Sequence, residues 1–381
     1  MARPRRFLRA GVGAGLVAAL LLPAAAAAGG GGGYGGGRDE GNVPHIFVIM
    51  LENHSLSTVI GDPNAPYITS LATRYAQATN YYGVTHPSEP NYVAAITGQM
   101  DTSVMDDNPN NTFAWPNLVD QLEAHRLTWG AYMEAMPSAG YTGAQWPSNT
   151  ALYANKHNPF VLMTDILSSP ARLSHIKPYT SLAADLDSRH APNFVWITPD
   201  QCNDMHGGVY VAVPGYAETP CPYGNTVDDA NDASLKAKAD AFVKSAVTTI
   251  KSSRAWTGNS AIFLMTDEAD YSGNAANDGW ADVSGCCDSP GYGGVPALPT
   301  GYQFLNSAGL PDGNTWAGGP FGGGKVPSIV VAREGDRGVV DATPYNHYSL
   351  LRTIEQVWHL GYLGYAADAR NVRSMVRMLE P

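Results

Sequence analysis

The sequence has little positive charge and few charged residues of either sign. Lysine and arginine number 23 against 34 aspartates and glutamates among 381 residues, so the formal net charge is −11, and charged residues make up 15% of the chain. Binding to nucleic acid relies on a basic stripe that meets the phosphates, so this balance argues against a nucleic-acid partner. The hydrophobic fraction of 44% is enough for a large core and excludes a disordered chain.

The sequence also lacks the signatures of several common enzyme classes. It contains no G-x-S-x-G segment of the common serine hydrolases, no H-E-x-x-H zinc motif and no complete Walker-type phosphate loop. The aspartate-rich run at residues 228–232 lacks the glycine that an EF-hand calcium loop has at its sixth position. A catalytic site would therefore be assembled from residues scattered along the chain.

Apolar runs long enough to span a membrane, about 20 residues, are missing. The apolar segment at residues 10–22 follows four arginines and precedes a run of alanines, which is typical of a cleaved signal peptide. We predict a signal peptide at residues 1–28, a flexible glycine-rich segment at residues 29–41 and one folded domain at residues 42–381. The mature protein would be exported, to the periplasm or the medium, with no transmembrane segment.

Cysteine is scarce, with four residues in the chain. In an exported protein they are candidates for disulfides, and three pairings are possible. Cys202 with Cys221 would close a short loop. Cys286 with Cys287 would then form a bridge between neighbours, or both would pair elsewhere. The remaining alternative is four buried thiols.

Apolar runs alternate with helical patterns along the chain. Residues 45–51 read HIFVIML, which is typical of a strand buried on both faces. Further strands are predicted at residues 128–132, 193–198, 260–266 and 326–332, and helices at residues 67–78, 91–97, 117–125, 233–252 and 348–360. This alternation predicts an α/β fold with a mostly parallel sheet.

Polar clusters follow the predicted strands, at the sheet edge where ligands bind in open α/β folds. The clusters are Glu52 with Asn53, Asp204 with His206, and Asp267 with Glu268. Carboxylate and amide oxygens are ligands for hard divalent cations, and histidine joins them in zinc sites. Each acidic pair taken alone is more often a helix cap or a solvated loop, so the metal site depends on their coming together.

Ser88 lies between two prolines, just before a predicted helix. A hydroxyl near a helix N-terminus is well placed to attack phosphorus, because free N–H groups there stabilise anionic oxygens. A metal ion can supply the activation that a lone serine lacks. The alternative is that Ser88 only caps the helix.

Seven stretches, in this order, resemble the phosphoesterase family of bacterial and fungal acid phosphatases and phospholipases C, within the alkaline-phosphatase-like superfamily. They are IMLENHS (49–55), THPSEPNY (85–92), YMEAMP (132–137), KHNPF (156–160), TPDQCNDMHG (198–207), MTDEADY (265–271) and YNHYSLLRTIE (345–355). The resemblance implies a three-layer α/β/α sandwich with a mostly parallel central sheet, and it makes residues 42–381 a phosphoesterase catalytic domain.

The resemblance also implies roles for individual residues. The implied metal ligands are Glu52, Asn53, Asp267 and Glu268. Ser88 matches the nucleophile, and His86 or His206 would assist the leaving group. The implied substrate-binding residues are Asn91, His157, Lys156, Asp204 and His347. Asp200 stands where many relatives carry Asn, which leaves open whether that position takes part.

The implied cofactor is a divalent metal ion, with zinc, calcium, magnesium and manganese all open, and the partner is a small phosphate ester or a phospholipid. We predict an acid-phosphatase-like phosphomonoesterase that acts through a serine nucleophile. The alternatives are a phosphodiesterase of the phospholipase C type, an inactive exported binding module on the same fold, and a glycosidase that uses paired carboxylates.

Overall fold

The computed structural model describes residues 43–100, 107–224, 229–272, 280–281, 284–287, 303–305, 311–315 and 322–380. The predicted signal peptide and glycine-rich segment lie outside the described residues, so both remain predictions, as does the boundary of the domain. Within the described part of the chain, no helix is long and apolar enough to cross a bilayer.

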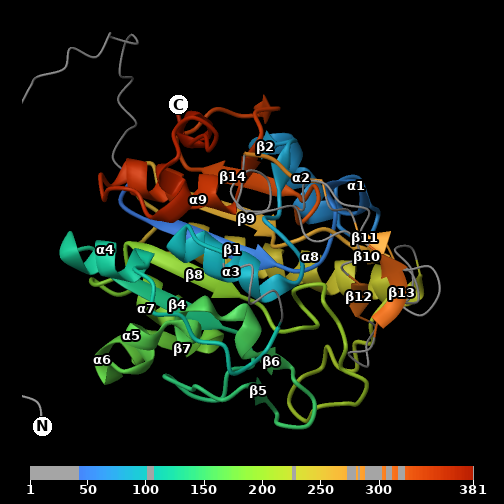
Figure 1. Cartoon of the computed structure of the whole chain (residues 1–381). Helices are drawn as coiled ribbons and strands as arrows, with labels where there is room; N and C mark the ends of the chain where they lie inside the picture. The colour runs from blue at the N-terminus through green and yellow to red at the C-terminus, as the bar shows by residue number, and fades with distance from the viewer. Residues whose placement is uncertain are drawn as a thin grey trace, which may run out of the picture. The chain divides into compact units, whose positions relative to one another are not determined.

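A central sheet of eight strands organises the described residues, in the order β15-β2-β14-β9-β1-β8-β4-β7 (Figure 1). Its strands are β1 (Ile46–Leu51), β2 (Ala76–Ala78), β4 (Trp129–Met133), β7 (Ile176–Pro178), β8 (Phe194–Thr198), β9 (Ala261–Thr266), β14 (Ser328–Ala332) and β15 (Val340–Asp341). Only β14 runs against its neighbours in this sheet, and every other neighbouring pair is parallel. The predicted α/β fold with a mostly parallel sheet is confirmed.

Shorter elements surround this sheet. Two-stranded pairings join β3 (Tyr81–Tyr82) with β16 (Tyr345–Asn346), β5 (Gln145–Trp146) with β6 (Tyr153–Ala154), β10 (Tyr271–Ser272) with β11 (Trp280–Ala281), and β12 (Gln303–Leu305) with β13 (Pro311–Thr315). The α-helices are α1 (Leu56–Val59), α2 (Pro66–Arg74), α3 (Ser88–Thr97), α4 (Leu118–Ala124), α5 (Thr164–Leu167), α6 (Pro170–Leu173), α7 (Leu182–Leu186), α8 (Ala230–Ser252) and α9 (His347–Val357). Short 3₁₀ turns lie at Asn155–His157, Pro159–Leu162, Tyr179–Ser181, Gly364–Ala367 and Val376–Met378.

Hydrophobic side chains project from both faces of the sheet, and helices cover each face, so the fold has three layers. Along β1, Val48 and Met50 enter one core while Phe47 and Ile49 enter the other, because successive strand residues point to opposite faces. Apolar residues of α3, α4 and α9 complete the first core, and those of α2, α7 and α8 complete the second. Each fully buried aliphatic or aromatic side chain stabilises the fold by about 1.5–3 kcal/mol before entropy is counted.

The predicted helix at residues 67–78 is wrong in its last part. The helix α2 ends at Arg74, and Tyr75 has an extended backbone. Residues 76–78 form β2, which pairs with β14 and β15. Local spacing favoured a helix there, but strand pairing with residues more than 200 positions away prevails. The other predicted elements are present, with ends that differ by a few residues.

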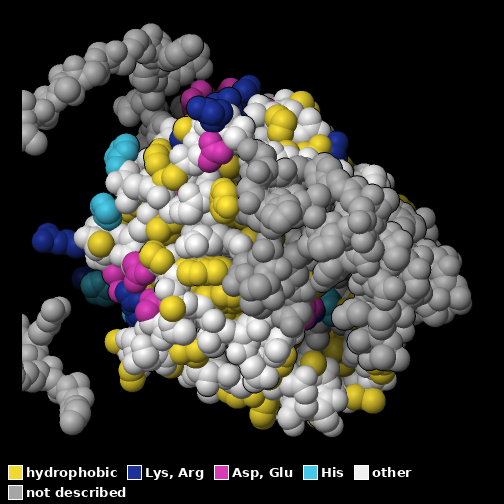
Figure 2. All heavy atoms as spheres, viewed as in Figure 1, with side chains coloured by type: hydrophobic (Ala, Val, Ile, Leu, Met, Phe, Trp, Pro, Cys, Tyr) yellow, Lys and Arg dark blue, Asp and Glu magenta, His cyan; other side chains and the backbone are white. Residues whose placement is uncertain are grey.

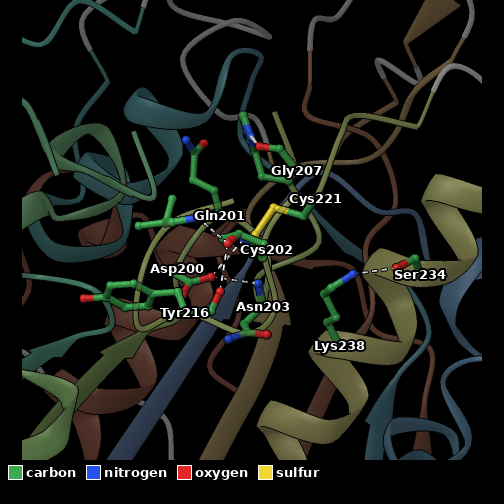
Figure 3. The surroundings of a disulfide bond; sticks show 12 residues. Asp200, Gln201, Cys202, Asn203, Gly207, Tyr216, Cys221, Ser234 and Lys238 are labelled. Carbon is green, nitrogen blue, oxygen red and sulfur yellow. Dashed lines mark hydrogen bonds between the residues drawn. A yellow bond between two sulfur atoms is a disulfide. The ribbon is translucent and has the colours of Figure 1, made fainter. Parts of the chain in front are cut away.

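Two disulfides link the four cysteines, Cys202 with Cys221 and Cys286 with Cys287. The first bond ties the loop after β8 to a strand-like contact in which Cys221 and Val209 exchange backbone hydrogen bonds of 2.7 and 3.1 Å. Figure 3 shows Asp200 beside this bond, where its Oδ1 accepts hydrogen bonds from the backbone N–H groups of Cys202 and Asn203. Asp200 therefore shapes the turn after β8.

Charged side chains are sparse on the face of the described residues in Figure 2, where hydrophobic and uncharged side chains dominate. This agrees with the low charged fraction of the sequence.

Candidate active site

The two acidic pairs meet because their strands are neighbours in the sheet. Glu52 and Asn53 follow β1, and Asp267 and Glu268 follow β9, whose register places Leu51 opposite Thr266. The backbone N–H of Asn53 donates to Asp267 Oδ1 over 3.1 Å, which joins the two turns directly. The structure thus brings the four predicted metal ligands to one point at the carboxyl edge of the sheet, as expected for such folds.

Ser88 is the first residue of α3 and faces the acidic group, which consists of the carboxylates of Glu52, Asp267 and Glu268. Its hydroxyl lies 2.8 Å from Glu52 Oε2, 2.8 Å from Glu268 Oε1 and 3.2 Å from Asn53 Oδ1. The residue is buried. Pro87 occupies the cap position of the helix, and no side chain caps it. The Ser88 hydroxyl is therefore turned to the carboxylates and does not cap its helix.

The acidic group has the chemistry of a cation site. Glu52, Asp267 and Glu268 are fully buried and offer oxygens within 4.8 Å of one another. Burial, and then the repulsion of the neighbouring carboxylates, raises the pKa values of Glu52 and Asp267 well above the usual range. Among the described residues, neither Glu52 Oε1 nor Asp267 Oδ2 accepts a hydrogen bond. A bound divalent cation would supply the missing positive charge and the missing partner atoms.

The amide of Asn53 lies against the same carboxylates. With its nitrogen turned inward, it would donate to Glu52 Oε2 at 2.7 Å and to Glu268 Oε1 at 3.2 Å; with its oxygen turned inward, it accepts from the Ser88 hydroxyl at 3.2 Å. The inward oxygen is the orientation that would suit a bound cation, and the inward nitrogen is the one that satisfies the carboxylates without a cation. The donor set of carboxylate, amide and hydroxyl oxygens fits a hard divalent cation.

A second group lies on the other side of Glu52. His157 places Nε2 3.2 Å from Glu52 Oε1 and Nδ1 3.3 Å from Asp204 Oδ2. Glu52, His157 and His206 offer ligand atoms within 4.8 Å of one another. Burial, with help from the charge of Lys156, lowers the pKa of His157 well below its usual value. A neutral imidazole is thus available beside Glu52.

His206 connects this group to a lysine. Its Nδ1 lies 2.9 Å from the carbonyl oxygen of Gly207, so Nδ1 carries the proton, and Nε2 accepts from the Tyr223 hydroxyl at 2.6 Å and the Lys156 ammonium at 3.1 Å. Burial, and then the charge of Lys156, lowers the pKa of His206 to about 3. Lys156 also lies 2.8 Å from Asp107 Oδ2. Although burial disfavours the ammonium, the charge of Asp107 raises the pKa of Lys156, so the lysine is charged.

Sequence reasoning missed Asp107 and Tyr223. The Tyr223 ring packs at a tilt against the His206 ring with centroids 4.8 Å apart, and Asp107 also accepts from the backbone N–H of Glu89 at 3.0 Å. Both residues lie in loops without a local motif. Lys156, the partner of Asp107, is 49 positions away in the chain, and His206, the partner of Tyr223, is 17 positions away. No spacing rule could have paired them.

His86 and Asn91 flank Ser88 in different ways. His86 Nδ1 makes a short contact with Glu268 Oε2. The Asn91 amide closes the preceding loop, since its oxygen accepts from the N–H groups of Val84 and Thr85 and its nitrogen donates to the carbonyl of Thr85 at 2.8 Å. Asn91 therefore holds the loop that presents Ser88, and its predicted contact with phosphate remains a prediction.

His347 lies against the backbone of Asp267. Its Nε2 is 2.5 Å from the Asp267 carbonyl oxygen, and its Nδ1 is 3.1 Å from the Tyr81 hydroxyl. Burial lowers its pKa to about 4, so the ring is neutral. Both ring nitrogens contact protein groups, and a substrate contact by His347 remains a prediction.

The sequence model of the Phosphoesterase family matches residues 62–217 and 223–361, which is more than half of the chain; Glu52 and Asn53 lie before the matched residues. An acid phosphatase of Aspergillus fumigatus is 40% identical over 166 residues, covering 42% of this chain and 36% of that protein. A phosphatidylinositol-3-phosphatase of Mycobacterium tuberculosis is 32% identical over 164 residues, covering 43% of this chain and 52% of that protein.

These matches span about half or less of the length of the curated relatives. A solved structure described under glycosaminoglycan metabolism by Bacteroides thetaiotaomicron shares the fold, with a TM-score of 0.50 and 13% identity over 88% of this chain and 81% of that one. The chain belongs to the Phosphoesterase family.

Proposed function

We propose that this protein is a metal-dependent hydrolase of phosphate monoesters in which Ser88 is the nucleophile. The observation that carries the proposal is the position of the Ser88 hydroxyl, 2.8 Å from Glu52 Oε2 and from Glu268 Oε1 in the first turn of α3. Membership of the Phosphoesterase family supports a phosphoric ester hydrolase, and two of the matched relatives are named acid phosphatase.

Glu52, Asn53, Asp267 and Glu268 would hold the divalent cation, which when bound lowers the pKa of the serine hydroxyl and neutralises phosphoryl charge. In the first step the Ser88 Oγ–P bond forms as the bond from phosphorus to the leaving oxygen breaks, and the hydroxyl proton passes to a carboxylate oxygen 2.8 Å away. In the second step water attacks the phosphoserine as the Ser88 Oγ–P bond breaks, a proton of the water returns to the histidine that protonated the leaving oxygen, and Ser88 recovers its proton from the carboxylate.

The remaining predicted site residues would bind the substrate and move protons. Lys156 is a charged ammonium beside the site and would attract the phosphate, which explains how an acidic protein admits an anion. His86, in contact with Glu268, would protonate the leaving oxygen, and His206, whose Nε2 accepts hydrogen bonds from the Tyr223 hydroxyl and the Lys156 ammonium, would hold these two donors in place. The neutral His157 would donate to a phosphate oxygen or join Glu52 as a ligand.

A phosphodiesterase of the phospholipase C type is the weaker candidate, because the matched relatives are named as phosphatases. An assay of ester hydrolysis separates the two, with the freed aryl alcohol, inorganic phosphate and phosphorylated headgroup each measured. The purified protein is given an aryl phosphate monoester, the matching diester and phospholipid vesicles, each with a panel of divalent cations. We expect the monoester to be hydrolysed fastest. Faster hydrolysis of the diester or the phospholipid, or no hydrolysis of any substrate, would overturn the proposal.

We further propose that the protein acts outside the cytoplasm. Both cysteine pairs of the chain form disulfides, which persist in oxidising compartments. Fractionation of the producing cells, with N-terminal sequencing of the exported form, tests this. Recovery of the full-length chain in the cytosol with free thiols would contradict it.

A further inference from the structure

A buried network of charged side chains joins the turn that carries Glu52 and Asn53 to the first turns of α8. Its members are Asp62, His54, Asp232, Lys236 and Asp270. All but Asp62 are at least nine-tenths buried. None of the five is assigned to the reaction above, and none contacts Ser88 in the hydrogen bonds or ion pairs of the described residues.

His54 is the centre of this network. Its Nε2 lies 2.7 Å from Asp232 Oδ1, and its Nδ1 lies 3.2 Å from the backbone carbonyl oxygen of Glu52. Both partner atoms are acceptors, so both ring nitrogens donate. Asp232 is fixed in turn, because Lys236 Nζ lies 2.8 Å from its other oxygen and also pairs with Asp62 over 2.9 Å.

Several hydrogen bonds hold the turn in an uncommon backbone conformation. Asn53 has φ of 32°, in the left-handed region that few residues other than glycine and asparagine adopt. Two further bonds help to hold the turn: Thr266 Oγ1 donates to the carbonyl oxygen of His54 over 2.8 Å, and the N–H of Ser55 donates to Asp270 Oδ2 over 3.0 Å. The direction of the Glu52 and Asn53 side chains thus depends on atoms outside the acidic group.

We infer that His54, oriented by Asp232, is a positioning residue whose hydrogen bond to the Glu52 carbonyl directs Glu52 and Asn53 towards Ser88. The inference rests on the proposed function, because these two residues are the proposed metal ligands. Groups that orient metal ligands typically change metal affinity or activity by about 10–100-fold when they are removed. A small displacement of a catalytic group is similarly costly, because reactivity depends steeply on geometry.

Two amide substitutions separate the two hydrogen bonds of the ring. In His54→Asn the amide nitrogen occupies the place of Nδ1 and keeps a donor for the Glu52 carbonyl. In His54→Gln it occupies the place of Nε2 and keeps only the bond to Asp232. Asp240→Asn is the matched control, since Asp240 is also buried on α8 and accepts from the backbone N–H of Ile68 at 2.8 Å, away from the turn.

The full-length variants are compared by urea unfolding, by kcat and KM on an aryl phosphate with saturating cation, and by calorimetric titration of Mn²⁺ and Zn²⁺ into metal-stripped protein. For His54→Gln we expect a loss of about 10–100-fold in kcat and in cation affinity, with KM changed by less than about threefold. For His54→Asn the losses in kcat and in cation affinity, taken as logarithms, should be no more than half of those for His54→Gln. Asp240→Asn keeps an acceptor for the Ile68 N–H and should keep wild-type kcat and cation affinity.

The inference is overturned if His54→Gln keeps wild-type cation affinity, or if His54→Asn and His54→Gln lose equally in kcat and affinity. It is also overturned if the wild-type protein binds neither cation. If the wild-type protein binds a cation and releases no phosphate, the proposed function fails, and the cation affinities of the variants still decide this inference.

Discussion

Glu355 offers a test of the electrostatics that does not depend on the active site. It lies on α9 and is fully buried. Its Oε1 accepts from the backbone N–H of Leu363 over 2.7 Å, while Oε2 has no hydrogen-bond partner among the described residues. Burial raises the pKa of this carboxyl to about 8, although the Leu363 N–H, Gln121 and Arg352 each act to lower it. The prediction concerns Glu355→Gln, which keeps the bond to Leu363 and removes the ionisable group.

The magnitude follows from proton linkage. The unfolded chain titrates near the ordinary value of 4.5, so the folded protein binds the proton more tightly than the unfolded chain does. The resulting stabilisation is fully present below about pH 4.5 and is lost as the pH rises through about 8. At about 1.4 kcal/mol for each pKa unit, the difference between 4.5 and about 8 corresponds to about 5 kcal/mol. This is a large part of the free energy of unfolding of a typical domain, which is about 5–15 kcal/mol.

Urea unfolding of both proteins between about pH 5 and pH 9 measures the effect. The free energy of unfolding of Glu355→Gln relative to wild type should rise with pH by several kcal/mol over this range. Glu334→Gln, at an exposed carboxylate beside Arg333, controls for removing one acid. Parallel pH curves for wild type and Glu355→Gln, differing by less than about 1 kcal/mol across the range, would refute the reasoning.

Three further predictions follow from the site and its scaffold. Dialysis against a chelator should remove more than nine-tenths of the activity and one divalent cation should restore it, whereas full activity in metal-free protein verified by elemental analysis would contradict the cation site. Asn117→Ala removes the capping box of α4 and should cost about 1–2 kcal/mol in urea unfolding without changing kcat; an unchanged midpoint would show that the cap contributes nothing. Gly83→Ala would place a Cβ 2.7 Å from the Asp267 carbonyl oxygen, so kcat should fall at least tenfold, and wild-type kcat would show that the backbone yields there at no cost.

The sequence predicted the strands well because their signal is local. The strand predicted at residues 45–51 differs from β1 by one residue, because a continuous apolar run that is buried on both faces can be recognised from the local sequence alone. The acidic pairs could likewise be placed at one sheet edge, because parallel neighbours end at the same edge. The β2 strand could not be predicted, since its three residues are a strand only through pairing with β14 and β15.

The contacts within the site were beyond sequence reasoning for the same physical reason. The bonds of Lys156 to Asp107, Tyr223 to His206 and His54 to Asp232 join residues that are 49, 17 and 178 positions apart in the chain. Residue type indicates that a histidine or an acid is available, but only the fold determines its partner. The disulfide pairing was similarly open until the backbone placed Cys202 and Cys221 with Cα atoms 5.4 Å apart.

Trapping the covalent intermediate tests the central claim most directly. Wild-type protein and Ser88→Ala are mixed with an aryl phosphate, quenched within the first turnovers and digested for mass spectrometry of the peptide that carries residue 88. We predict a phosphoryl group on Ser88 in the wild type, and no adduct with turnover below a few per cent of wild type in Ser88→Ala. A phosphoryl group on another residue, or substantial turnover by Ser88→Ala, would contradict the account.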